Sequence, residues 1–433
     1  MKSKAFSTDN ELFSGYPSLS KSNFNNKIDS NVRLGMLVFF INAMHMLRNL
    51  SQIYFVLWAI SFSLSIYLIL KKIGEFENRI LMFFIVNSLF LLCIILSYNY
   101  SGEFGSPLIG IARIGFILPV IYILLFNLDK HNYQIYVYLW LIYGVLAALS
   151  LPIQYLIGPV AWFSESFERV GTQRFGSLAG SLTTFGNISG ALLFIAFYLN
   201  RKILLMIFVV IILLIGIIAS LQKAAIASVL VSVLTLMMAG KIRIYAIFTI
   251  TFIIIIFSIY GIYFIDFETK NTLFLLFETF TGTADAHFVS DVSIYQSLID
   301  RVTYLPMLAF DYYGYHAAII GVGVFGGSGS LGYPELPHTH NLFGETIMIF
   351  GILPAIFIFI FMILILRKSL IILIFSTHYE TSVVLAAGIF INMLIPTIFA
   401  GALFYHPAGA GIFWASVIYL QFYGVQIKIN RIK

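Results

Sequence analysis

Long apolar runs, separated by short polar or Gly/Pro interruptions, repeat along the chain from Arg33 almost to its end. A bilayer with a hydrocarbon core of roughly 30 Å requires about 20 apolar residues per helix, and the runs approach this length. Alternating segments of about ten residues, typical of transmembrane barrels, are not seen. The pattern predicts an all-α integral membrane protein of about 12 transmembrane helices. The expected spans are 34–49, 52–70, 79–97, 107–127, 132–153, 177–199, 202–219, 224–239, 243–265, 341–366, 380–400 and 408–425.

Composition supports the bilayer as the solvent of this protein. The 433 residues are 60% hydrophobic and 10% charged, with a mean hydropathy of +0.96. A water-soluble globule could not bury so much apolar surface. The single cysteine, Cys93, excludes an intramolecular disulfide and a thiolate metal cage.

The spans divide the chain into regions of different character. Residues 1–32 are polar, lack the apolar core of a signal peptide and are expected to form a cytoplasmic tail. Residues 33–265 hold helices 1–9, and 341–425 hold helices 10–12. A large outer loop, 266–340, separates helices 9 and 10, and a basic tail, 426–433, ends the chain. A loop of this length in a compact membrane protein is usually functional or partly helical.

Charge placement predicts the orientation. With both termini cytoplasmic, most of the 25 Lys and Arg residues fall in cytoplasmic tails and loops, as the positive-inside rule requires. The net charge of +6 is spread between apolar runs and forms no single patch, which argues against nucleic acid as a partner.

The densest polar cluster of the outer loop stands where the tenth span begins. His340 and Glu345 lie within about one and a half helical turns, so the carboxylate could orient an imidazole that titrates near neutrality. The alternative is that Thr339 or Asn341 caps the helix and His340 is only interfacial. A zinc site at His338 and His340 lacks a third ligand at regular spacing, so no metal is predicted.

Five cations on the expected outer side are candidates for binding an anion. Arg301 precedes a glycine-rich stretch and can hold a phosphate with two parallel donors, or form a salt bridge with a neighbouring acid. Arg174 opens a run of small residues that lets an extended backbone approach a ligand, although glycines there also favour helix packing. Lys223 is either a third cation or an ordinary snorkelling lysine. Arg113, inside an apolar run, should face a cavity or a partner, and Arg169 is a secondary candidate.

Taken in order, these pieces resemble the O-antigen polymerase and ligase superfamily, which includes Wzy-type polymerases and lipopolysaccharide O-antigen ligases. The resemblance covers roughly residues 169–354. Its sharpest part looks like the family's HN-x-[FY]-x-E-(x)5-G run and comprises His340, Asn341, Phe343, Glu345 and Gly351, followed by Pro354.

Three further segments carry the resemblance. Arg301, twenty residues before Gly321-Val322-Gly323, looks like the family's arginine ahead of its GxG segment. Arg174 with Gly176 is similar to the arginine and glycine that open an earlier membrane segment. Lys223 departs from the pattern, since the family usually has arginine there. Lysine keeps the positive charge but lacks the planar guanidinium that donates two parallel hydrogen bonds to a phosphate.

The resemblance implies a glycosyltransferase that needs no cofactor, whose donor is a glycan on undecaprenyl diphosphate at the outer face of a bacterial cytoplasmic membrane. Arg301, Arg174 and Lys223, with Arg113 as a secondary residue, would hold the diphosphate, His340 would act as base, and Asn341 and Glu345 would orient it. No DxD pair occurs in the outer loops, which fits a metal-independent reaction. A chain-length regulator and a flippase are the expected protein partners.

Three functions stay open at this point. A polymerase transfers the growing chain to another lipid-linked repeat and is the favoured interpretation. A ligase transfers it to a lipid A core or a protein. A transporter or flippase would instead place ionisable residues near the membrane midplane, whereas the candidates here, with the exception of Arg113, lie at one face.

Overall fold

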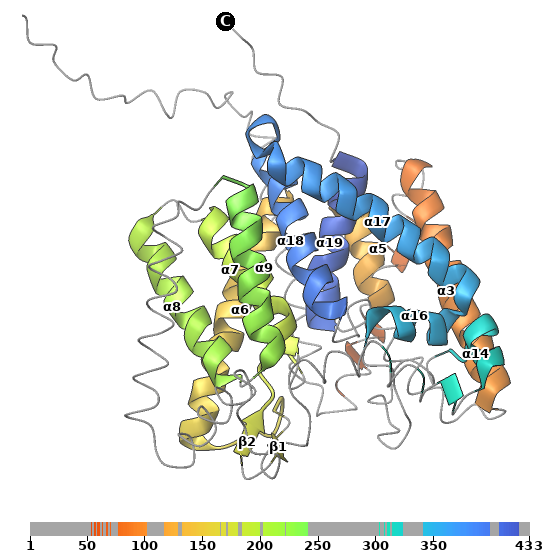
Figure 1. The fold of residues 1–433 in the computed structure, drawn as a ribbon, viewed down its shortest axis with the longest axis horizontal. Helices are drawn as coiled ribbons and strands as arrows, with labels where there is room; N and C mark the ends of the chain where they lie inside the picture. Colours follow the sequence, from red (N-terminus) through yellow and green to blue (C-terminus); the bar gives the residue numbers. More distant parts are fainter. Residues whose placement is uncertain are drawn as a thin grey trace, which may run out of the picture.

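A computed structural model shows a mostly helical protein (Figure 1). Isolated positions are described within 53–70 and 303–311. The continuous described stretches are 77–101, 117–128, 132–164, 166–169, 172–180, 184–199, 202–220, 222–240, 314–323, 341–398 and 407–423. The expected spans 34–49 and 243–265 and most of the 266–340 loop lie outside the described residues.

The described helices follow the expected apolar runs within a few residues at most ends. They are α3 (Glu77–Ser101), α5 (Ile117–Asn127), α6 (Asn132–Ile157), α7 (Thr184–Leu199), α8 (Ile203–Ala219), α9 (Lys223–Met238), α14 (Tyr315–Ile320), α16 (Leu342–Phe350), α17 (Ile352–Ile374), α18 (Thr381–Ile398) and α19 (Pro407–Tyr423). A 3-10 turn, η3 (Ser376–His378), connects α17 to α18. The prediction of a helical protein is therefore confirmed, with one short hairpin, β1 (Ser166–Arg169) and β2 (Thr172–Phe175), added to it.

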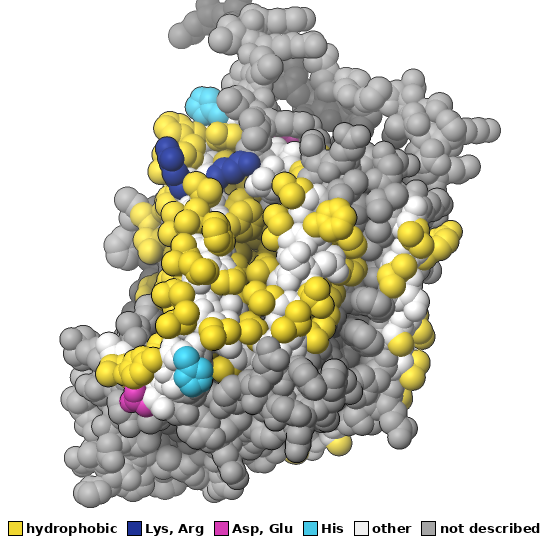
Figure 2. All heavy atoms as spheres, turned by 90° about the vertical axis from the view of Figure 1, so that its right-hand side faces the viewer, with side chains coloured by type: hydrophobic (Ala, Val, Ile, Leu, Met, Phe, Trp, Pro, Cys, Tyr) yellow, Lys and Arg dark blue, Asp and Glu magenta, His cyan; other side chains and the backbone are white. Residues whose placement is uncertain are grey.

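Three of the described helices, α6, α17 and α18, are long and apolar enough to cross a membrane. α17 exposes large apolar side chains such as Leu353, Phe357 and Ile363, which are 67%, 72% and 62% exposed. Among the described residues on the face in Figure 2, apolar side chains predominate. A surface of this kind fits lipid better than water. The total of twelve spans stays a prediction.

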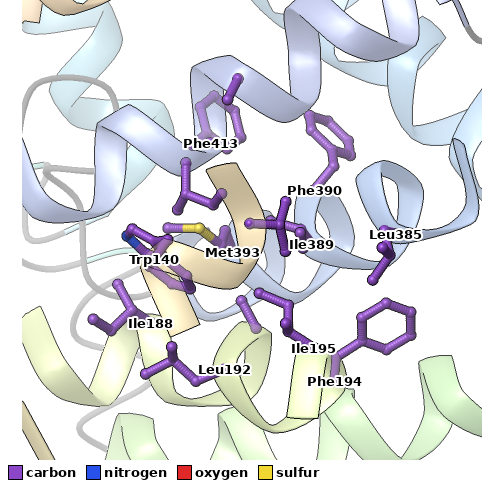
Figure 3. Close-up of a cluster of buried hydrophobic side chains, with 14 of the residues drawn as sticks. Trp140, Ile188, Leu192, Phe194, Ile195, Leu385, Ile389, Phe390, Met393 and Phe413 are labelled. Atoms are coloured by element: carbon purple, nitrogen blue, oxygen red, sulfur yellow. The ribbon is translucent and has the colours of Figure 1, made fainter. Parts of the chain in front are cut away.

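The core lies between α6, α7, α18 and α19, whose large side chains meet in Figure 3. Trp140 of α6 lies near Ile188 and Leu192 of α7, and Phe390 of α18 stacks on Phe413 of α19 at 5.5 Å between ring centroids. Close helix approach depends on small residues. A Cβ at Gly388 of α18 would collide with the Phe194 ring of α7. Glycine at such contacts is the usual route to tight packing between membrane helices.

The expected single span 341–366 is wrong, because the chain breaks at Gly351 into α16 and α17. Gly351 has φ 82° and ψ 166°, a conformation that favours glycine. Pro354 then falls in the first turn of α17, where it has no N–H to donate to the Phe350 carbonyl. In Figure 1, α16 runs across the direction of α18 and α19.

Arg79 ties together the ends of three helices. Its guanidinium, on α3, donates to the carbonyls of Leu125 (2.6 Å) and Leu128 (3.3 Å) at the end of α5 and to the hydroxyl of Tyr423 (2.6 Å) on α19. Its Cζ also lies 5.3 Å from the ring centroid of Phe422. The terminal carbonyls of α5 have no partner within their own helix, and the C-terminal dipole of a helix favours a cation. The buried charge is therefore held by a helix end and two aromatic rings.

Replacing Arg79 by alanine is expected to lower the free energy of unfolding by about 1–3 kcal/mol, because buried carbonyls lose their donor. Thermal unfolding of the purified protein in detergent measures the effect. The matched control is Arg367→Ala, since Arg367 is an exposed arginine on α17. Equal melting temperatures for the two variants would contradict the structural role of Arg79.

Candidate functional site

Asn341 caps the short helix α16. Its backbone is extended (φ −141°, ψ 154°), and its side-chain oxygen accepts a hydrogen bond from Gly344 N at 2.6 Å. Asparagine is among the preferred residues for this position, because its side chain pairs with an N–H that the helix leaves free. The capping interpretation is thereby confirmed for Asn341. The role of Asn341 in orienting His340 stays a prediction.

Glu345 lies one turn further along α16. Its backbone N–H donates to the Asn341 carbonyl at 3.0 Å, and the residue is only 6% exposed. A carboxylate in the first turn of a helix interacts favourably with the helix dipole, which offsets part of the cost of burying it. Spacing places Asn341 and Glu345 on one side of the helix. His340 directly precedes the cap, and both His340 and His338 lie outside the described residues.

The Gly321-Val322-Gly323 segment docks against the end of α16, so two of the motifs singled out in the sequence are in contact. Val322 N donates to the Met348 carbonyl (2.7 Å), and Gly323 N donates to the Ile349 carbonyl (3.1 Å). These carbonyls belong to the last turn of α16 and have no partner in their own helix. The segment therefore caps the C-terminus of α16 with backbone groups.

Both glycines at this contact are required by space as well as by conformation. A Cβ on Gly321 would lie 2.6 Å from the backbone N of Gly351, and one on Gly351 would lie 2.6 Å from the Ile320 carbonyl carbon. Their φ angles are 92° and 82°. Two backbones thus approach each other where any side chain would separate them.

The segment that carries Arg169 and Arg174, expected on the outer side, forms the β1–β2 hairpin, which was not among the expected elements. The register pairs Arg169 with Thr172 and Phe167 with Arg174. Cross-strand partners share a face, as do alternate residues of a strand, so positions 169 and 174 occupy one face of the hairpin. The sequence feature that could have predicted this hairpin is Val170-Gly171, which lies between two short alternating runs.

Residues 176–180 are not helical, so the expected start of a span at residue 177 is wrong and α7 begins at Thr184. Side chains of α6 hold this segment. Gln154 donates to the Gly176 carbonyl (3.0 Å), Tyr143 donates to the Leu178 carbonyl (2.8 Å), and Leu178 N donates to the Ser150 hydroxyl (2.9 Å). Because α6 satisfies these backbone groups, a non-helical turn can lie among membrane helices.

The N-termini of α7 and α9 lie together. Gln222, just before Lys223 at the start of α9, accepts a hydrogen bond from Gly186 N in the first turn of α7 (3.0 Å). Ser228 of α9 donates to the Gly186 carbonyl (2.8 Å), and a Cβ on Gly190 would collide with the Ser228 carbonyl. Gly186 and Gly190 therefore act as packing residues, in line with the packing alternative for the glycines that follow Arg174. Gln222 was missed, since a side chain that caps another helix leaves no local sequence signal.

Tyr155 connects the hairpin to the end of α8, shortly before α9 begins. Its ring packs edge-on against Phe175, at 4.9 Å between centroids, and its hydroxyl donates to the Ala219 carbonyl (3.1 Å) at the end of α8. Half-buried Arg174 lies within electrostatic reach of the same tyrosine. Arg174 and Lys223 therefore belong to one end of the bundle. Figure 1 places the hairpin, α16 and α14 at this end of the molecule.

The N-termini of α7 and α9 thus lie at the same end of the bundle as the positions of Arg169, Arg174 and Lys223. Helix N-termini together with cations favour the binding of an anion. Arg113 and Arg301 lie outside the described residues, and so their positions stay predictions. No family model matches this chain, and no curated protein matches it either.

Alanine at Gly321 or Gly351 is expected to destabilise the protein by more than alanine at Gly158. Gly158 also has a positive φ (87°), but a Cβ added there would meet no atom within 4 Å. Gly158→Ala therefore reports the backbone cost alone, about 1–2 kcal/mol. The other two substitutions add a collision with backbone. Melting temperatures in detergent compare the three, and equal losses would contradict the proposed contact.

Asn341→Ala is expected to cost about 1 kcal/mol of stability, whereas Asn341→Ser retains an oxygen that can cap α16 and costs less. Thermal unfolding of both variants measures the difference. If serine were as damaging as alanine, capping would not be the main contribution of Asn341 to stability.

Proposed function

We propose that this protein is a membrane glycosyltransferase that polymerises oligosaccharide repeat units carried on undecaprenyl diphosphate. It acts at the outer face of a bacterial cytoplasmic membrane, through twelve spans with both termini inside. The observation that carries the proposal is the gathering of Arg174, the start of α9 at Lys223 and two helix N-termini at one end of the bundle. Such an arrangement suits a diphosphate. The lipid carrier, the glycan and the reaction type are taken from the sequence resemblance.

The reaction needs a base, a leaving-group site and an acceptor. His340 removes the proton of the acceptor hydroxyl, whose oxygen attacks the anomeric carbon of the donor sugar. The bond from that carbon to the diphosphate oxygen breaks, and its electron pair leaves with the undecaprenyl diphosphate. Negative charge grows on that leaving group, so fixed cations at Arg301, Arg174 and Lys223 lower the barrier. Arg113 is a secondary member of this set, and Arg169 and His338 are further candidates.

The described geometry shows a helix held at both ends directly after the proposed base in sequence. Asn341, which follows His340 in the sequence, caps the start of α16. Glu345 is buried one turn later, and the opposite end of α16 is held by Val322 and Gly323. A catalytic group placed next to a rigid element loses less orientation than one on a free loop.

The test is a polymerisation assay with purified protein in detergent, undecaprenyl diphosphate-linked repeat units and EDTA, read as a ladder on a gel. Wild type is expected to produce the ladder. His340→Ala is expected to lose about 10²–10⁴-fold in rate, as for a general base. Arg301→Ala and Arg174→Ala are expected to lose about 10²–10³-fold, as for groups that stabilise developing charge.

Arg367→Ala is the matched control, since it removes an exposed arginine from α17 and should leave the ladder unchanged. Lys223→Arg should keep activity that Lys223→Ala loses. All variants must elute and melt as the wild type does. Full activity in His340→Ala would refute the base, and a well-folded wild type without a ladder would favour ligase or transport activity.

A further inference from the structure

The short helix α14 exposes apolar side chains, although its segment was expected to lie in the large outer loop. Tyr315, Ile319 and Ile320 are 69%, 64% and 60% exposed, and Met307, shortly before the helix, is 59% exposed. A helix on the surface of a soluble loop normally turns polar residues outward. Several large apolar side chains exposed together mark an interaction surface.

The remaining side of this segment is already occupied. Phe310 packs against Val322 and Met348 in a small apolar cluster separate from the main core. Directly after α14, the backbone of Val322 and Gly323 is hydrogen-bonded to the last turn of α16. α14 is therefore attached to the α16–α17 break through one side, and its apolar side faces away from the protein.

The exposed side chains of α14 continue the exposed face of α17. α14 contacts both α16 and α17. The first turns of α17 expose Leu353 (67%) and Phe357 (72%), and α17 is one of the helices able to cross a membrane. Figure 2 shows apolar side chains extending over one face, with histidine and charged side chains near its upper and lower ends. Whatever covers the exposed apolar face of α17 therefore also covers α14.

We propose that α14 is an interfacial helix whose exposed apolar residues insert into the lipid at the α16 end of the molecule. Tyr315 suits the headgroup level, where aromatic residues with a polar atom are enriched. Exposed Asp311 and His316 would face headgroups or water. An amphipathic segment of this kind lies in the plane of the interface. Lipid contact then fixes the depth of the Gly321–Gly323 segment and, through it, of the α16 end. This inference does not depend on the proposed activity.

The test is nitroxide labelling of single cysteines in the full-length protein, with Cys93→Ser as background, in vesicles of phosphatidylethanolamine and phosphatidylglycerol. Labels at Ile320→Cys and Ile319→Cys are compared with Phe357→Cys, on the apolar face of α17, and Thr377→Cys, exposed in the η3 turn. Collisions with oxygen report lipid, and collisions with a water-soluble nickel chelate report water. Because these side chains are exposed, the substitutions should leave packing unchanged.

Labels at 319 and 320 are expected to match Phe357→Cys, with frequent oxygen collisions and a loss of nickel collisions relative to Thr377→Cys. Nickel collisions as frequent as at Thr377→Cys would place α14 in water and overturn the proposal. Low collision with both reagents would mean that protein covers the helix, which overturns it as well. The readout needs no enzymatic turnover, so failure of the proposed function would not affect it.

Discussion

The pairing of backbone polar groups in a hydrocarbon surrounding is the constraint on which the rest of this structure depends. Lipid offers no hydrogen bonds, so every N–H and C=O that a helix leaves free must find a partner within the protein. Three solutions occur in the described part of the chain. The end of α16 uses the backbone of Val322 and Gly323, the non-helical residues 176–180 use side chains of α6, and the end of α5 uses Arg79.

These solutions allow the chain to leave the helical conformation without losing stability, and two of them occur at the same end of the molecule (Figure 1). Non-helical backbone, helix N-termini and the positions of Arg169, Arg174 and Lys223 are all found there. A site that handles a charged substrate needs such groups, whereas the remainder of the bundle needs apolar side chains and glycines that pack. The division between a polar end and an apolar body follows from the two requirements.

Much of the helical part could be predicted because apolar runs and their interruptions are local properties. α6, α8, α9 and α18 begin within a residue or two of the expected positions. The Asn341 cap could be predicted as one alternative, because asparagine directly before an apolar run is a common start of a helix. The break at Gly351 was missed, because the apolar run continues through it without a change in hydropathy. The hairpin was missed because its four-residue strands are short beside the helices.

The sequence by itself determined that the chain is helical and strongly apolar, with polar or Gly/Pro interruptions near most of the observed helix ends. It could do so because φ/ψ preference and hydropathy belong to individual residues and their neighbours. Tertiary structure alone decided which side chain satisfies which helix end. Gln222 pairs with Gly186, and Arg79 pairs with Leu125 and Leu128, across separations that no local pattern records. The physical reason is that a free backbone N–H or C=O can pair with any suitable side chain. Only the packing of the whole bundle brings one particular side chain within reach.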